Sequence, residues 1–288
     1  MAHAVRHEID LPEGGRAVVH DSGTGAAEAA PVLVWHHGSP QSGELLPPVV
    51  DAAAARGLRV LSPARSGYGG STRRSGRSVA DAARVVGHAL DALGITASYA
   101  VGASGGGPHA LALAALRPDL VAGAVTLAGV APYDGSDAWF AGMADDGGLR
   151  SALDGTEART RHAETAEFDA SSFVAADVAM FSGPWGALGA DAGRAGEEWP
   201  AGIVDDDVAF VRPWGVELAQ VATPVLVVQG GADRVIPRHH GELLVEALPA
   251  AELWLRPRDG HVSVLGALPV ACDWLVDLAG EGRPGPQM

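Results

Sequence analysis

The strongest indication of the fold is the stretch Tyr99-Ala100-Val101-Gly102-Ala103-Ser104-Gly105-Gly106-Gly107-Pro108. Its first three residues are strand-like, and residues 108–116, rich in Ala and Leu, are helix-like. Ser104 therefore lies on a sharp turn between a strand and a helix, in the pattern Gly-x-Ser-x-Gly. Such a turn needs small neighbours, because its backbone comes close to the adjoining strand and helix. We expect the Ser104 hydroxyl to project from the turn as a candidate nucleophile.

Short apolar runs recur along the chain on both sides of this turn. The strand candidates are residues 31–35, 58–61, 99–101, 124–127, 225–228 and 252–255. Most of these runs are continuously apolar, as expected of strands that are buried on both faces of a sheet. Helical segments lie between them, and strands that alternate with helices form mostly parallel sheets. The sequence therefore predicts an α/β fold in which helices cover both faces of a mostly parallel sheet.

Local signals mark two further elements. The clearest helix spans residues 78–93, where Ser78 and Asp81 form a capping box at its start and Gly94 ends it. Near the N-terminus, apolar and polar residues alternate over residues 5–11, a Gly-Gly turn follows, and an apolar run returns. This pattern predicts a hairpin of two antiparallel strands.

The alternation of strands and helices stops between residues 132 and 217, where no strong strand is expected. All five Phe and four of the seven Trp fall in this segment. We predict a core formed by residues 1–131 and 218–288 and a helical cap, or lid, formed by residues 132–217. Most of the aromatic side chains are expected to form a small core within the cap, and some to face a ligand. The candidates for substrate contact are His37, Trp139, Phe140, Phe181, Trp185 and Trp214.

The composition narrows the classes of function. The 288 residues carry a net charge of −15, which repels phosphate backbones and anionic lipid surfaces. The chain contains neither Lys nor Asn, which excludes Schiff-base and P-loop lysine chemistry and a Cys-His-Asn site. Its single cysteine, Cys272, lies in an apolar stretch and is expected in the core. We expect a small-molecule substrate as the partner and no nucleic acid or membrane, and we leave a homodimer open.

Neither a targeting segment nor a metal site is expected. The first 15 residues lack an apolar run of signal-peptide length, and no stretch reaches the ~18 apolar residues of a membrane span. The adjacent His36 and His37 point in opposite directions on an extended chain, and no third ligand accompanies them. The other pair, His239 and His240, opens a helix and is expected at the surface. We therefore predict a cytoplasmic protein with no cofactor and no metal.

A serine hydroxyl needs a base within hydrogen-bond reach and a group that orients the base. His261 follows the last strand candidate, and Asp233 follows the strand candidate at residues 225–228. Both therefore lie at carboxyl ends of strands, where the sites of such sheets assemble. With Ser104 they form the predicted catalytic set, and Asp134 is the alternative acid.

The segment His36-His37-Gly38-Ser39-Pro40 directly follows another strand candidate. Attack on an ester carbonyl creates an oxyanion, which two preorganised backbone N–H groups can stabilise. The amides of Ser39 and Gly105 are the candidates for this oxyanion hole.

Taken together, these residues resemble the α/β-hydrolase fold family, and in particular its capped, serine esterase-like branch. The resemblance covers nearly the whole chain and rests on motifs that occur in the family's order: residues 37–38, 65–69 and 102–106, Asp233, and residues 260–261. It implies an eight-stranded, mostly parallel sheet with a helical lid inserted after the sixth strand.

The resemblance also implies a serine hydrolase that cleaves a small, largely apolar carboxylic ester or lactone through an acyl-enzyme. Ser104 would attack, His261 would transfer the proton, and Asp233 would orient the imidazole. Ser104 stands where epoxide hydrolases and haloalkane dehalogenases of the family carry Asp, which disfavours both of those chemistries.

Two alternatives stay open. One is an aminopeptidase of the proline iminopeptidase type, in which Glu164, Glu167 or Asp169 of the cap would hold a substrate amine. The chain departs from those enzymes, because its oxyanion segment lacks their Gly-Gly form and its serine turn lacks their Trp. The other alternative is a ligand-binding protein or a lyase of the same fold, in which Ser104 is idle.

Overall fold

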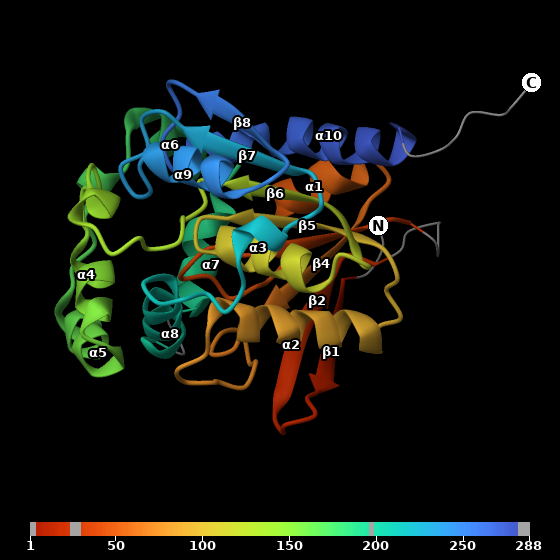
Figure 1. Ribbon diagram of the computed structural model, residues 1–288, viewed down its shortest axis with the longest axis horizontal. Helices are drawn as coiled ribbons and strands as arrows, with labels where there is room; N and C mark the ends of the chain where they lie inside the picture. Colours follow the sequence, from red (N-terminus) through yellow and green to blue (C-terminus); the bar gives the residue numbers. More distant parts are fainter. Residues whose placement is uncertain (1–3, 24–29, 196–198, 282–288) are drawn as a thin grey trace, which may run out of the picture.

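One eight-stranded sheet runs through the computed structural model, which describes residues 4–23, 30–195 and 199–281 (Figure 1). The strands are β1 (Val5–Asp10), β2 (Arg16–Asp21), β3 (Val32–His36), β4 (Arg59–Ala64), β5 (Ser98–Ala103), β6 (Val121–Leu127), β7 (Val225–Gly230) and β8 (Ala251–Arg256). Their order in the sheet is β1-β2-β4-β3-β5-β6-β7-β8. The pairs β1–β2 and β2–β4 are antiparallel and every other pair is parallel. The predicted hairpin and the mostly parallel sheet are therefore confirmed.

The strands in the middle of the sheet end at one common edge. β3, β5 and β7 are buried over their whole length, as their continuously apolar sequences predict. In the register of the sheet, Gly102 of β5 lies opposite both His36 of β3 and Thr126 of β6. Leu127 of β6 in turn lies opposite Val228 of β7. The loops that follow these strands therefore start side by side.

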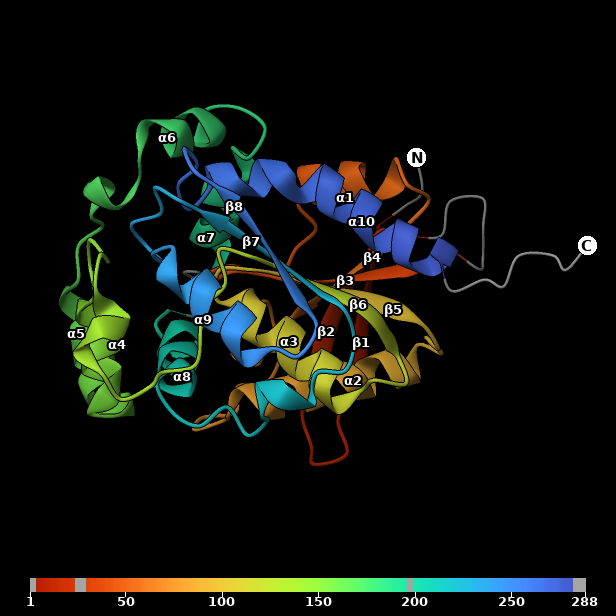
Figure 2. The ribbon, with the colours of Figure 1, turned by 45° about the horizontal axis from the view of Figure 1, so that its top comes forward.

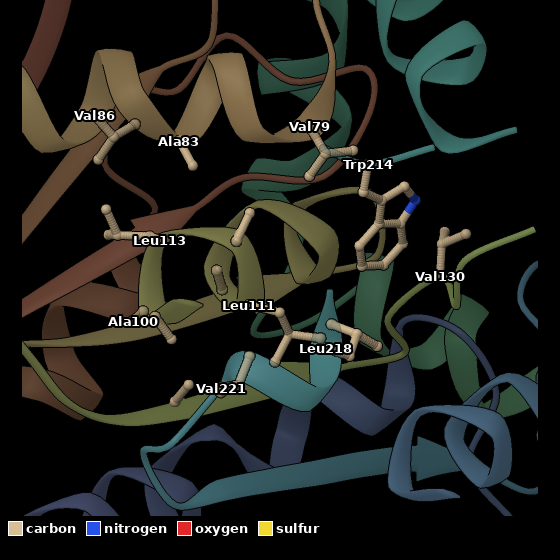
Figure 3. Close-up of a cluster of buried hydrophobic side chains, with 14 of the residues drawn as sticks. Val79, Ala83, Val86, Ala100, Leu111, Leu113, Val130, Trp214, Leu218 and Val221 are labelled. Carbon is tan, nitrogen blue, oxygen red and sulfur yellow. The ribbon is translucent and has the colours of Figure 1, made fainter. Parts of the chain in front are cut away.

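Helices cover both faces of the sheet (Figure 2). α1 (Pro47–Ala54) and α10 (Leu268–Glu281) pack on one face, and α2 (Val79–Ala92), α3 (Gly106–Leu116) and α9 (His239–Ala247) pack on the other. Each face has its own cluster of buried apolar side chains. In the cluster on the second face, Val86 of α2 and Leu113 of α3 lie with Trp214 and Val221 from the segment before β7 (Figure 3).

The start of α2 follows the predicted capping box. The Ser78 hydroxyl accepts a hydrogen bond from the Asp81 amide at 3.1 Å, and the Asp81 carboxylate accepts one from the Ser78 amide at 3.0 Å. Gly94 follows the helix with a φ of +69°, a conformation that glycine adopts without strain. Both predicted ends of this helix are therefore confirmed.

A helical insertion lies between β6 and β7, and no strand interrupts it in the part of the chain that the structure describes. Its helices are α4 (Gly147–Leu153), α5 (Thr156–Thr165), α6 (Ala175–Phe181), α7 (Ala187–Ala195) and α8 (Ala201–Phe210). Short 3-10 helices cover Asp137–Phe140 (η1), Ala170–Ser172 (η2) and Leu218–Gln220 (η4), and a further one, η5 (Ser263–Ala267), precedes α10. α4 and α5 lie at one end of the molecule, and α8 packs between them and α2 (Figure 1).

The two ends of this insertion share the core of the sheet. Trp139 and Phe140 of η1 and Val208 and Phe210 of α8 belong to the buried cluster on the α2 and α3 face. The assignment of residues 132–217 to a separate cap domain stays a prediction, and residues 1–3 and 282–288 of the predicted core lie outside the described residues. No helix of the described residues has the length and apolar character needed to cross a bilayer.

Candidate active site

Ser104 lies on the turn between β5 and α3. Its φ is +51°, in the left-handed region that residues with a side chain seldom adopt. The Ser104 amide donates a hydrogen bond of 2.8 Å to the carbonyl of Leu127, which ties the turn to the end of β6. A sparsely populated backbone conformation that is held in place by its surroundings is typical of functional sites.

The glycines around Ser104 are required by the lack of space. A Cβ atom at Gly102 would lie 2.3 Å from the carbonyl oxygen of Gly106, and a Cβ atom at Gly106 would lie 1.9 Å from that of His36. Both distances are far shorter than any van der Waals contact, so a side chain would force the backbone to move. The close packing of this turn against α3 and β3 thus explains the Gly-x-Ser-x-Gly pattern.

The structure brings Ser104, His261 and Asp233 together in one chain of hydrogen bonds. His261 Nε2 lies 3.0 Å from Ser104 Oγ, and His261 Nδ1 lies 2.9 Å from Asp233 Oδ2. A carboxylate can only accept, so Nδ1 carries the hydrogen and Nε2 is free to accept the proton of the Ser104 hydroxyl. The turn after β5 and the loops after β7 and β8 supply the three groups.

Asp233 is held by its own loop. Its Oδ1 atom accepts hydrogen bonds of 2.9 Å from the amides of Val235 and Ile236, and its side chain is fully buried. The other oxygen faces His261 and also lies 3.4 Å from Gln229 Nε2. The carboxylate is therefore fixed in the orientation that holds the imidazole.

The surroundings of His261 favour its protonated form. Burial alone would lower the pKa of this imidazole, but the negative charge and hydrogen bond of Asp233, with a contribution from Asp177, raise the pKa above its ordinary value. An imidazole that gains affinity for a proton in this way is suited to accept one from a serine hydroxyl.

Ser39 and Gly105, the residues whose amides are predicted to form the oxyanion hole, lie beside each other. A Cβ atom built on Gly105 would lie 2.5 Å from Ser39 Oγ. Neither the Ser39 amide nor the Gly105 amide donates to an acceptor within the described residues. Ser39 also lines the same cavity as Ser104. The assignment of these two amides to an oxyanion hole stays a prediction.

A buried ion-pair network, not predicted from the sequence, supports this oxyanion segment. The Arg65 guanidinium donates to the carbonyls of His37 and Gly38, the latter at 3.0 Å, and to Ser39 Oγ at 2.8 Å. Asp206 of α8 lies 2.8 Å from Arg65 Nη2 and accepts a hydrogen bond of 2.5 Å from the Ser39 hydroxyl. Arg77 donates to the other oxygen of Asp206. Burial opposes ionisation of Asp206, but the two arginines hold its pKa well below the usual range.

A cavity of about 620 Å³ opens at Ser104. Its polar lining residues are Ser39, Gln41, Ser104 and His261, and among the described residues no charged side chain lines it. The insertion contributes Phe168, Phe173, Phe181 and Leu188, and the core contributes Trp35, Val262 and Leu265. The three Phe rings form a series: Phe168 stacks on Phe173, and Phe173 meets Phe181 edge to face. The cavity is therefore neutral and mostly apolar.

Of the six side chains predicted to contact a substrate, Phe181 alone lines this cavity. The prediction was wrong for the aromatic residues Trp139, Phe140, Trp185 and Trp214, all of which are buried in the two apolar clusters. It was also wrong for His37, whose ring is buried between the Arg65 amide and the Gly38 carbonyl. Composition placed aromatic residues in the insertion but could not give the direction of each side chain, so Phe168 and Phe173 were missed.

Other sequence predictions fell on residues away from the cavity. Asp134 is exposed and accepts a hydrogen bond from the Ser136 amide. It does not orient His261, whose Nδ1 is hydrogen-bonded to Asp233. The cap carboxylates Glu164, Glu167 and Asp169 are exposed and line no part of the cavity.

The expectation of a surface position was wrong for His240. It is fully buried at the start of α9, where its Nδ1 accepts from the Ala131 amide at 3.2 Å and its Nε2 donates to the Trp139 carbonyl at 3.0 Å. Burial, the largest influence, lowers the pKa of this imidazole to about 3. His240 is thus a neutral core residue that ties α9 to η1. No group of three or more His, Cys, Asp or Glu side chains suited to a metal ion occurs within the described ranges.

The chain is similar to known proteins over most of its length. A family model described as alpha/beta hydrolase fold matches residues 31–267. Among solved structures, a hydrolase from Pseudomonas aeruginosa has a TM-score of 0.68 at 22% identity. The match covers 96% of this chain and 98% of the chain of that hydrolase. A thermophilic esterase from Thermogutta terrifontis has a TM-score of 0.68 at 20% identity, with 96% and 99% covered.

A curated relative is similar over a shorter stretch. Haloalkane dehalogenase 2 of Mycobacterium bovis is 34% identical over 113 residues, which make up 38% of this chain and 37% of that protein. The matched stretches span only about a third of the length of the curated relatives.

Proposed function

Because the chain belongs to the alpha/beta hydrolase fold family, we propose that it is a serine hydrolase that cleaves a small, uncharged carboxylic ester or lactone. The single observation that carries the proposal is the hydrogen-bonded chain Asp233–His261–Ser104 at a neutral cavity. Nucleophile, base and orienting acid lie within hydrogen-bond distance of one another, as acyl transfer through a serine requires.

In the proposed reaction, the Ser104 hydroxyl attacks the ester carbonyl while His261 Nε2 accepts its proton. Negative charge then develops on the carbonyl oxygen, where the Ser39 and Gly105 amides can donate to it. The protonated imidazole gives its proton to the leaving alcohol, and the acyl group stays on Ser104 as an ester. A water molecule, deprotonated by His261, attacks this ester and releases the acid. Asp233 accepts the hydrogen bond of Nδ1 throughout and stabilises the imidazolium.

The lining of the cavity supports an uncharged, mostly apolar substrate. A charged substrate group would lose its hydration there, and no described side chain of opposite charge lines the cavity to compensate it. For the same reason nothing in the cavity favours an aminopeptidase, which would need a carboxylate near the substrate amine. A volume of about 620 Å³ lies within the ordinary range for small-molecule sites.

Dehalogenation is disfavoured although one relative is named a haloalkane dehalogenase. The family resemblance implies an Asp nucleophile in those enzymes, and this chain has Ser104 in that position. An alkyl-serine ether would form in place of an alkyl ester, and water attacking a carbonyl could not release it.

The experiment is labelling with a fluorophosphonate probe together with hydrolysis of p-nitrophenyl acetate and butyrate. We expect rapid labelling and hydrolysis by the wild-type protein, and loss of both in Ser104→Ala. If the folded wild-type protein neither reacts with the probe nor hydrolyses the esters, the ligand-binding or lyase alternative replaces the hydrolase.

A further inference from the structure

Asp177, a carboxylate of the helical insertion, reaches across to the loop that carries His261. It lies on α6 and its side chain is fully buried. Its Oδ1 atom accepts hydrogen bonds from the Val262 amide at 2.9 Å and from the Ser263 amide at 2.7 Å. Its Oδ2 atom accepts one from the His261 amide at 3.2 Å. Three consecutive amides of the histidine loop thus converge on one carboxylate.

Two further donors complete the surroundings of this carboxylate. The Ser263 hydroxyl donates to Oδ1 at 2.8 Å, and the Val174 amide donates to Oδ2 at 3.1 Å. No Arg or His side chain of the described residues forms an ion pair with Asp177. A buried carboxylate without a counter-ion is costly unless hydrogen bonds satisfy it. The histidine loop therefore supplies most of the stabilisation that this charge needs.

The sequence of the loop is adapted to the carboxylate. A Cβ atom at Gly260 would lie 2.2 Å from Asp177 Oδ2. Any side chain at this position would therefore push α6 away from the loop or break the hydrogen bonds. The glycine before His261 is explained by this close approach.

α6 also belongs to the wall of the cavity. Phe181, its last residue, lines the cavity, and so does Phe173, two residues before α6 begins. The same short helix thus holds the backbone of His261 through Asp177 and contacts whatever occupies the cavity.

We propose that Asp177 is a positioning residue, which holds the backbone of His261 so that its imidazole stays within hydrogen-bond distance of Ser104. This role rests on the proposed hydrolase function. Asp233 orients the ring at Nδ1, whereas Asp177 fixes the main chain through its amides. A displacement of the ring by as little as 1 Å would lower the rate on the order of 10²-fold.

The charge of Asp177 gives the proposal a second, independent readout. Asp233 and Asp177 are the charged groups that act on the imidazole, and both raise the pKa of His261. Loss of one negative charge therefore lowers that pKa. Because the base must be unprotonated, activity is lost as the pH falls through the pKa, so this limb of the profile moves to lower pH.

The test compares Asp177→Asn with wild type in ester hydrolysis over pH and in an NMR titration of the His261 imidazole. The His261 resonance is identified by its absence in His261→Gln. We expect kcat to fall on the order of 10²-fold with KM within about twofold, and both the acid limb and the NMR midpoint to move to lower pH. Ser263→Ala removes one donor to Asp177 and the acceptor of the Gly260 amide, and it leaves the three amides that donate to Asp177. It should lower kcat about fivefold and serves if Asp177→Asn does not fold.

Asp207→Asn is the matched control. Asp207 is also a buried carboxylate of the insertion, but it pairs with Arg159 at 2.6 Å and touches no part of the histidine loop. This variant should lose thermal stability yet keep wild-type kcat and the wild-type His261 midpoint. If Asp177→Asn also loses only thermal stability and keeps wild-type kcat and the wild-type His261 midpoint, Asp177 merely stabilises the fold and the proposal is overturned. If the wild-type protein hydrolyses no ester, the hydrolase function fails, and the NMR midpoints still decide whether Asp177 acts on His261.

Discussion

In the proposed hydrolase, the Ser104 hydroxyl is a useful nucleophile only while His261 accepts its proton and Asp233 holds the ring. We expect Ser104→Ala, His261→Ala and Asp233→Asn each to lower kcat by on the order of 10⁴-fold or more. The double variants should be hardly worse than the single ones, because the three side chains act as one unit. Steady-state hydrolysis of p-nitrophenyl butyrate measures both effects.

Asp134 provides the control for the acid. Its carboxylate is exposed and caps its own turn, so Asp134→Asn should leave kcat near the wild-type value. Equal damage from Asp134→Asn and Asp233→Asn would mean that the acid has been misassigned.

Ser104, Asp233 and His261 could be predicted as neighbours from the sequence. Each of them follows a strand, and the end of that strand can be located in the sequence. Ser104 is marked by its glycines, and the two others by their places after β7 and β8. The direction of a side chain has no such local signal. Trp139 and Phe181 have similar surroundings in the sequence, yet the first is buried in the core and the second lines the cavity.

At the scale of elements, Asp206 links α8 to the loop between β4 and α2, which supplies both Arg65 and Arg77. Asp206→Asn would leave two buried guanidinium groups without their shared counter-ion, which costs about 3–5 kcal/mol when a buried pair is broken. We expect this loss in the free energy of unfolding, measured by urea denaturation. Because Arg65 also holds the oxyanion segment, kcat should fall with little change in KM.

An exposed ion pair is the comparison for this variant. Asp137 pairs with Arg150 at the surface, and Asp137→Asn should leave both the unfolding midpoint and kcat close to wild type. A small effect of Asp206→Asn, similar to that of Asp137→Asn, would show that the buried network is not needed for stability.

The sequence predicted the helices and strands far better than the side-chain contacts that join them. The capping box of α2 and the apolar strands are local patterns, and they formed as expected. The contact between Arg65 and Asp206 joins residues 141 positions apart, and the contact between Asp177 and Val262 joins residues 85 apart. The run Asp205-Asp206-Asp207 was visible in the sequence, but nothing local indicates that the three carboxylates pair with four arginines, two of them on Asp206.

On the scale of the whole molecule, two buried clusters enclose the sheet, and the insertion contributes to both. Residues of η1 and α8 complete the cluster under α2 and α3, while Trp185 packs beside Trp35 in the other cluster. The alternation of strands and helices determines the sheet, so the fold class could be predicted. The way in which the insertion closes over the sheet depends on pairings across the chain, which one sequence does not reveal.

Cys272 offers a probe of this whole arrangement. Its thiol is fully buried in α10 against the sheet, and burial, the largest influence, raises its pKa to about 11. Both the lack of access and the lack of thiolate should make the native protein unreactive toward a disulfide reagent such as DTNB. Labelling in dilute urea should therefore follow the opening of the fold, with a rate that rises as the free energy of unfolding falls, and should be faster in Asp206→Asn than in Asp137→Asn. Rapid labelling of Cys272 in native protein that keeps its activity would mean instead that α10 detaches from the sheet without unfolding the rest.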